Sequence, residues 1–178
     1  MRDRILYRAK QFWFALVAKM TEEDRLYVHQ NLNLKEAAMF FTLPDYEQKH
    51  AVVVAQKMVK LAQGFRHLDQ KKVIRLGLLH DVGKVGAKLS IFDKGLLVIL
   101  HRILPPVYDS LAQWGRGDKP FFYFKKFYVH KHHGAVGAEM LKKVSENEDI
   151  IDEIRRHDEP VSEHDVYLKI LDLADSTF

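Results

Sequence analysis

Apolar residues recur at helical spacing along most of the chain, and no stretch shows the alternation of a β-strand. A helix is predicted over residues 45–62, where Asp45 and Gln48 have the spacing of a capping pair. Residues 73–79 are densely apolar, which predicts a helix near the centre of the fold. Another apolar stripe follows in residues 148–157. Together these patterns predict an all-α fold.

The last predicted helix carries a carboxylate on its apolar side. Ser162 is expected to cap this helix, with Asp165 at the reciprocal position. Leu168, Leu171 and Asp175 then share one face, at i, i+3 and i+7. Asp175 therefore needs a partner, because an unpaired charge on a buried face is costly.

The first part of the chain also has helical spacing, and a second helix is predicted to start at Thr21. Nothing in this part has catalytic character. We therefore interpret residues 1–42 as a helical appendage that packs on a main domain, residues 43–178. An amphipathic face for a membrane or a partner is the alternative for the appendage.

Residues 85–129 are the least regular part of the chain. A helix is predicted over residues 95–104, and Pro105-Pro106 breaks it before a shorter helix at residues 107–114. Residues 121–128 interleave aromatic side chains with lysines. We interpret this stretch as an aromatic helix face that covers the core while its lysines lie in solvent. Base stacking and phosphate attraction are the alternative.

Composition limits the kinds of site that the chain can build. The 178 residues contain no cysteine, which excludes disulfides and thiolate metal sites. The net charge of +4 suits an anionic substrate but does not indicate specific nucleic-acid binding. No segment approaches the roughly 18 apolar residues that a transmembrane helix needs. We therefore expect a cytoplasmic protein without a transmembrane segment.

A His-Asp pair ends the most apolar predicted helix, and Gly83 and Lys84 follow it closely. A neutral imidazole and an adjacent carboxylate can bind one divalent metal, and the carboxylate can also bridge two. A single His80-Asp81 dipeptide is weak support for a metal site. However, a polar pair at the end of a buried helix is costly unless it is paired or coordinated.

Other histidines fall on faces from which they can converge on this pair. His50 shares a helix face with Val54 and Met58, and His157 lies on the apolar stripe of its own helix. Three histidines occur within residues 130–133, namely His130, His132 and His133, and only those on the correct helix face can be ligands. Several unsatisfied polar groups in one small core would be expensive, so a shared dinuclear site is plausible.

The sequence resembles the HD superfamily of metal-dependent phosphohydrolases over roughly residues 43–178. The resemblance rests on His50, the His80-Asp81 pair with Gly83-Lys84, the stretch from His133 to Leu141, His157 and Asp175. It implies an HD-domain helical bundle that binds two divalent ions. One ion would be held by His50, His80, Asp81 and Asp175. Asp81 would bridge to a second ion held by His133 and His157.

Nitrogen and oxygen ligands without thiolates favour Mn²⁺ or Fe²⁺, while Zn²⁺, Ni²⁺, Co²⁺ and Mg²⁺ are possible. The resemblance implies hydrolysis of a phosphoester or phosphoanhydride bond, with a nucleotide, a dinucleoside polyphosphate or a cyclic dinucleotide as substrate. The stretch His133-x-x-x-Gly137-Ala138-Glu139 has a counterpart in hydrolases of cyclic dinucleotides, but their Gly-Tyr-Pro motif is missing.

Three cations are candidates for contacts with the substrate. Lys84 lies close to the His-Asp pair and is predicted to be catalytic together with Asp81. Its role would be a contact with the substrate phosphate that strengthens in the transition state. Arg155 and Arg156 precede His157 and are weaker candidates for substrate binding. Two other functions are kept as alternatives: a nucleotide sensor that retains the metal site without catalysis, and a di-iron oxygenase on the same scaffold. Oligomeric state is left open.

Overall fold

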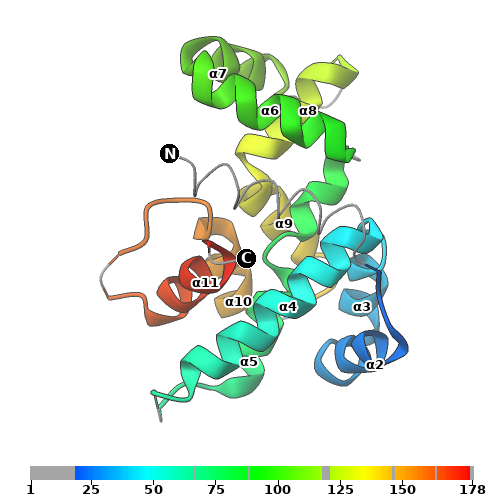
Figure 1. The fold of residues 1–178 in the computed structure, drawn as a ribbon, viewed down its shortest axis with the longest axis vertical. Coiled ribbons are helices and arrows are strands. Elements are labelled where there is room, and N and C mark those ends of the chain that lie inside the picture. The colour runs from blue at the N-terminus through cyan, green and yellow to red at the C-terminus, as the bar shows by residue number, and fades with distance from the viewer. Residues whose placement is uncertain are drawn as a thin grey trace, which may run out of the picture.

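A computed structural model describes residues 19–65, 67–87, 89–117, 121–145, 147–162 and 164–176. Within these residues it contains ten α-helices, one 3₁₀ helix and no strand, which confirms the all-α prediction (Figure 1). The helices are α2 (Glu22–Asn31), α3 (Leu34–Phe40), α4 (Asp45–Ala62), α5 (Gln70–Leu79), η1 (Val82–Ala87), α6 (Ile91–Ile103), α7 (Pro105–Trp114), α8 (Phe122–Lys131), α9 (His133–Leu141), α10 (Glu148–Arg156) and α11 (Val166–Ser176).

The pair α4 and α5 forms the centre of the fold, and α11, α10 and α2 all pack against it. A Cβ added at Gly77 of α5 would lie 2.6 Å from the Cα of Ala55 on α4. Glycine therefore allows the two backbones to approach closely. Val54 and Met58 of α4 and Leu76 of α5 are fully buried in the main core. The dense packing gives the end of α5 a well-defined position.

Helices α2 and α3 share this main core, to which they contribute Val28 and Phe40. The predicted start of α2 is confirmed, because Thr21 and Asp24 form a capping box there. The helix expected before Thr21 falls within residues 1–18, which lie outside the described residues. The predicted domain boundary at residue 43 stays a prediction.

Helices α6, α7 and α8 pack on one another around a second, smaller core. Its buried members are Ala87, Leu89, Leu97, Tyr108 and Val129. Figure 1 shows this lobe, formed by α6–α8, at one end of the molecule, and α8 links it to η1 and α9. Among the described helices, none combines the length and apolar character that crossing a membrane requires.

The prediction for the aromatic stretch is wrong in part. Phe127 and Tyr128 do pack against the small core. Phe121, Phe122 and Tyr123, however, are mainly exposed at the start of α8. They are not among the side chains that pack against the small core, and Lys126 lies over the rings of Phe122 and Tyr123.

Two predicted helix caps are also wrong. Pro44 occupies the cap position of α4 without a side-chain bond, and Gln48 instead donates to the carbonyl oxygen of Leu43 at 2.7 Å. At α11 the carboxylate of Asp165 accepts from the backbone N–H of Leu168 at 3.2 Å, so Asp165 is the cap rather than Ser162. Local spacing identified each helix start but not the group that satisfies its N–H donors.

Asp24 gives a test of stability against pH. Its carboxylate accepts from Lys49 Nζ at 2.6 Å and from the Thr21 backbone at 2.9 Å. Burial acts to raise the pKa of Asp24, but these bonds outweigh it and lower the pKa below 3.8. The stability that they provide is therefore fully present above the unfolded-state pKa and is lost as pH falls through the lower folded-state pKa.

We predict that Asp24→Asn destabilises the fold by about 1–2 kcal/mol at neutral pH, because a hydrogen bond to a charged group is lost. The difference from the parent chain should close as pH falls below about 4. Urea unfolding of both chains between neutral and acid pH measures this. Glu23→Gln, on an exposed neighbour, is the control and should change stability by less than about 0.5 kcal/mol. A constant Asp24→Asn deficit at all pH values would contradict the assignment.

Candidate metal centre

The His80-Asp81 pair lies where α5 ends and η1 begins. Both side chains are only 1% exposed. The backbone N–H of Lys84 donates to the carbonyl of Asp81 at 3.0 Å and closes the turn. A Cβ on Gly83 would lie 1.9 Å from the carbonyl oxygen of His133, so this turn sits directly on the first turn of α9. This contact sets where Asp81 meets the histidine of α9.

Two groups of candidate ligands result. The first contains His50 from α4, His80 from the end of α5 and Asp175 from α11, with ligand atoms within 4.8 Å of one another. His50 Nε2 lies 2.9 Å from Asp175 Oδ1. The Asp175 side chain is 47% exposed, so this group is open to solvent on one side.

The second group contains Asp81, His133 from α9 and His157 from the end of α10, again within 4.8 Å. His133 Nε2 lies 3.4 Å from Asp81 Oδ1 and 3.2 Å from His157 Nε2. The three residues are spread along the sequence, and Asp81 and His157 are 76 positions apart. The predicted spacing alone could not show that they meet.

Asp81 joins the two groups through different oxygen atoms. Its Oδ1 faces His133, while its Oδ2 lies 3.2 Å from His80 Nε2 and 3.7 Å from His50 Nε2. The structure thus brings together all six residues predicted as ligands, with Asp81 between the two sets. Their roles as ligands stay predictions.

The protonation of the three inner histidines can be read from their backbone contacts. Nδ1 of His80, His133 and His157 lies 2.9, 3.2 and 2.7 Å from a carbonyl oxygen. A carbonyl can only accept, so Nδ1 of each ring carries a proton, and a ring that is neutral presents the lone pair of Nε2. Such backbone bonds are how proteins orient histidines that bind metals.

This arrangement fits a bound cation. The Nε2 atoms of His133 and His157 face each other with lone pairs and no proton between them, which is unfavourable without a positive charge. Nε2 of His80 is buried and makes no hydrogen bond of acceptable geometry, although Asp81 Oδ2 is near it. Orphaned buried nitrogen atoms are rare in folded proteins, and divalent ions bind such atoms well.

The pKa shifts in the second group favour the protonation states that metal ligands need. Burial lowers the pKa of His133 well below its usual value, helped by the charge of Lys84, and burial also lowers the pKa of His157. Burial acts to raise the pKa of Asp81, but the neighbouring His80 and Lys84 outweigh it and hold the pKa well below 3.8. At neutral pH the second group is therefore a carboxylate with two neutral imidazoles.

In the first group the carboxylates and histidines shift one another's pKa values. Burial acts to lower the pKa of His80, but the carboxylate of Asp81 outweighs it and raises the pKa. Burial acts to raise the pKa of Asp175, but the hydrogen bond from His50 and the charges of His80 and His50 together outweigh it and lower the pKa to about 2. A metal at this group would therefore compete with the proton that Asp81 stabilises on His80.

Lys84 places its ammonium group on Asp81 Oδ2, and Glu47 Oε2 lies 3.9 Å from the same nitrogen. Lys84 also lines a cavity of about 600 Å³ beside the turn. The walls of this cavity are mainly apolar, and its other lining residues are Thr42, Leu43, Pro44, Glu47, Val85 and Leu89. A cationic group thus lies between the candidate centre and a space for a ligand.

Sequence reasoning missed Asp158, which supports the second group. Its Oδ2 accepts from the backbone N–H of Gly134 at 3.1 Å and lies 3.6 Å from His133 Nδ1. In the sequence Asp158 resembled only a helix terminator, although its position directly after His157 was a usable signal. Asp172, one turn before Asp175 on α11, is exposed.

The other predicted candidates lie outside both groups. Arg155 pairs with Glu139 at 2.8 Å, and Arg156 pairs with Asp152 and Asp165, so the structure does not bring either to the cluster. His130 contacts the hydroxyl of Tyr108 at 2.6 Å, and His132 packs on the ring of Tyr128. A substrate role for the two arginines stays a prediction.

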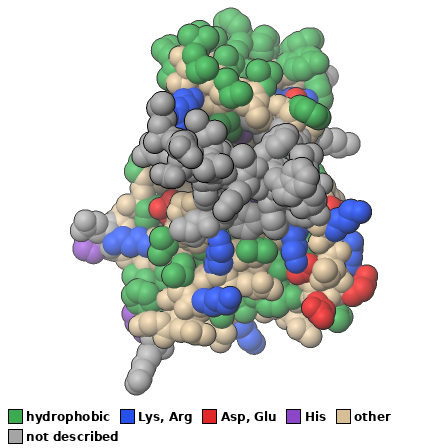
Figure 2. All heavy atoms as spheres, viewed as in Figure 1, with side chains coloured by type: hydrophobic (Ala, Val, Ile, Leu, Met, Phe, Trp, Pro, Cys, Tyr) green, Lys and Arg blue, Asp and Glu red, His purple; other side chains and the backbone are tan. Residues whose placement is uncertain are grey.

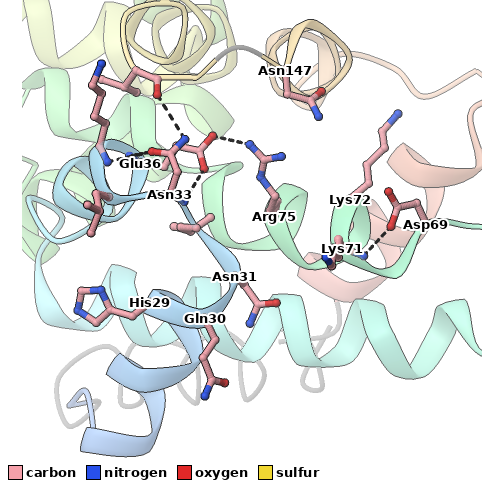
Figure 3. Close-up of a pocket in the computed structure, with 14 residues that line it drawn as sticks. His29, Gln30, Asn31, Asn33, Glu36, Asp69, Lys71, Lys72, Arg75 and Asn147 are labelled. Carbon is pink, nitrogen blue, oxygen red and sulfur yellow. Dashed lines mark hydrogen bonds and ion pairs between the residues drawn. The ribbon is translucent and has the colours of Figure 1, made fainter.

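A larger cavity of about 1160 Å³ lies between α2–α3 and the starts of α5 and α10. None of the six candidate ligands lines it. Figure 3 shows Arg75 in this cavity pointing to Glu36, to which it is bonded at 2.6 Å. Lys72 is likewise paired, with Glu153 at 2.8 Å. Two of the four lysines and arginines that line this cavity are therefore used within the protein.

An all-helical bundle with clustered histidines and aspartates is typical of proteins that bind divalent metals. A family comparison makes this specific, because the HD domain model matches residues 48–177. The chain belongs to the HD domain family, whose members are generally metal-dependent hydrolases. Neither a curated protein nor a solved structure matches the chain significantly.

We predict that Gly83→Ala weakens both the fold and metal binding, because the new methyl group would collide with the His133 backbone. Overpacking of this kind costs about 1–3 kcal/mol. The control is Gly86→Ala, whose methyl would meet side-chain methyl groups, of Val136 at 3.3 Å and of Val129 at 3.5 Å, and not backbone. Urea unfolding and calorimetric titration with Mn²⁺ measure the two effects. Equal behaviour of the two variants would contradict the proposed role of the close contact.

Proposed function

We propose that the chain is a metal-dependent phosphohydrolase that cleaves a phosphoester or phosphoanhydride bond at a dinuclear site. One observation carries the proposal: the two oxygens of the buried Asp81 face two separate sets of ligand nitrogens. A carboxylate in this position is suited to bridge two cations. Membership of the HD domain family supports the same reaction class.

In this proposal the side chains have separate roles as metal ligands and as supporting groups. His50, His80 and Asp175 would hold one ion, His133 and His157 would hold the other, and Asp81 would contribute an oxygen to each. The donors are nitrogen and oxygen atoms only, which favours Mn²⁺ or Fe²⁺. Bound divalent ions supply a water of lowered pKa and neutralise charge on the phosphoryl oxygens. Asp158 keeps the backbone at Gly134 in place and so orients His133.

Lys84 is proposed to contact the phosphate group of the substrate. Its ammonium lies on Asp81 and at the edge of the 600 Å³ cavity, so it can reach a phosphate placed over the centre. A cation in this position stabilises negative charge that develops on the phosphoryl group. Glu47 holds Lys84 from the other side and limits its freedom.

The proposed substrate is a nucleotide-type molecule. The apolar walls formed by Leu43, Val85 and Leu89 offer space for a base or sugar next to Lys84. Ligand sites commonly combine an apolar lining with a few placed polar groups. The domain that performs the reaction is proposed to be residues 43–178.

The proposal is tested by a phosphate-release screen over mono-, di- and cyclic nucleotides with Mn²⁺, Fe²⁺ and Mg²⁺. We predict that Asp81→Ala lowers turnover at least about a hundredfold, because loss of a directly bound group should exceed the effect of a supporting one. Bound metal, measured by mass spectrometry, should fall from two ions to less than one. Asp172→Ala is the matched control on an exposed acid and should retain both. Full turnover in Asp81→Ala would overturn the proposal.

A variant of Lys84 tests the phosphate contact independently of metal binding. We predict that Lys84→Met lowers kcat by about 10²–10³-fold, as expected when one charge-stabilising donor is removed. Metal content should stay at the parental value, because Lys84 is not a ligand. Lys60→Met, on the exposed side of α4, controls for loss of one positive charge. A fall in metal content that parallels the fall in kcat would instead assign Lys84 a structural role.

A further inference from the structure

Helix α6 presents an apolar stripe to solvent. Its members recur at i, i+4, i+7 and i+11, which places them on one helix face, and they are 80, 61, 56 and 67% exposed: Phe92, Leu96, Ile99 and Ile103. Leu97 is buried in the small core. An apolar stripe at this spacing normally covers a core. Here α6 has one apolar face inside the lobe and another that no described residue covers.

The same lobe exposes further large apolar side chains. They come from the α6–α7 corner, the end of α7 and the start of α8, and they are Leu104, Val107, Trp114, Phe121, Phe122 and Tyr123. Figure 2 shows hydrophobic side chains gathered over the end of the molecule that Figure 1 assigns to α6–α8. Large contiguous apolar patches mark interaction surfaces on folded proteins.

The charge of the lobe is distinctive. Residues 89–131 contain seven lysines or arginines and three aspartates, a net charge of +4. The whole chain has 28 basic and 24 acidic residues, also +4, so the remainder is neutral. Asp93 and Asp109 are already paired with Lys126 and Lys131. Among the described residues of the lobe, the exposed Arg102, Arg116 and Lys125 make no ion pair.

We propose that the α6–α8 face is a docking surface for an anionic lipid membrane. Apolar and aromatic side chains can enter the boundary between headgroups and acyl chains, while nearby cations meet anionic headgroups. Tryptophan and tyrosine suit this boundary because each has an apolar ring and a polar group. The lobe lies on the membrane without spanning it, which agrees with the absence of a spanning helix among the described residues.

A second copy of the chain is a poorer occupant of the same face. In a two-fold dimer the face would meet itself, so two lobes of charge +4 would be brought together. Like charges across an interface oppose association. The unpaired cations are complementary to anionic lipid and not to another copy.

The test is co-sedimentation of the full chain with vesicles, without substrate or added metal. Vesicles of phosphatidylcholine mixed with phosphatidylglycerol should bind the protein, and vesicles of phosphatidylcholine alone should bind it more weakly. High salt should reduce binding to the anionic vesicles, because it screens surface charge. Equal binding to both vesicle types, or no binding to either, would overturn the proposal.

A matched pair of variants locates the surface. Leu96→Glu on α6 should lower the vesicle affinity by about tenfold or more, since one apolar anchor is replaced by an anion. Leu26→Glu on α2 is the control, because Leu26 is 59% exposed and carries the same change outside the lobe. Ile99→Glu should reproduce the effect of Leu96→Glu. Circular dichroism confirms folding of each variant.

The oligomeric state, measured by light scattering, shows whether a second copy of the chain covers this face instead of a membrane. If the parent chain is a dimer that Leu96→Glu converts to a monomer, and vesicle binding is unaffected, the face belongs to another copy and the proposal is wrong. Neither measurement depends on phosphate release. Failure of the membrane proposal is therefore distinguishable from failure of the proposed hydrolase activity.

Discussion

The buried negative charge of Asp81 is the constraint on which the centre of this molecule depends. A carboxylate that is 1% exposed is stable only if positive groups or hydrogen-bond donors surround it. Those groups come from different elements: His80 from α5, Lys84 from η1 and His133 from α9. The close contact of Gly83 with the His133 backbone joins η1 to α9, and the close contact of Gly77 with Ala55 joins α5 to α4, which carries His50. Packing and electrostatics thus support each other at this point.

Much of the centre was predictable because helix periodicity determines which side chains face inward. His50, His157 and Asp175 were each assigned to an apolar face from spacing alone, and the structure brings them together around the end of α5. The choice of His133 among three nearby histidines also agrees with its place beside Asp81. The helical class followed from the same periodicity, since no alternating segment competed with it.

Features that depend on contacts between distant segments could not be predicted in this way. Asp158 supports His133 through the backbone of Gly134, a relation between residues 24 positions apart. Gln48 donates to the carbonyl oxygens of Phe41 and Leu43 in the segment before α4 and does not cap its own helix. The exposure of Phe121 and Phe122 depends on how little core the lobe offers. The local sequence does not determine such contacts between distant segments.

The wide spacing of the six residues along the chain has a consequence for folding. They extend from His50 to Asp175, and α4, α5, α9, α10 and α11 must all dock before the two groups exist. Contacts between such distant segments form late and slowly in folding. Unfolded or partly folded chains therefore lack the assembled site, and metal ions that bind only the native state would raise its population. Metal supply and the lifetime of the folded chain would then be linked quantities in the cell.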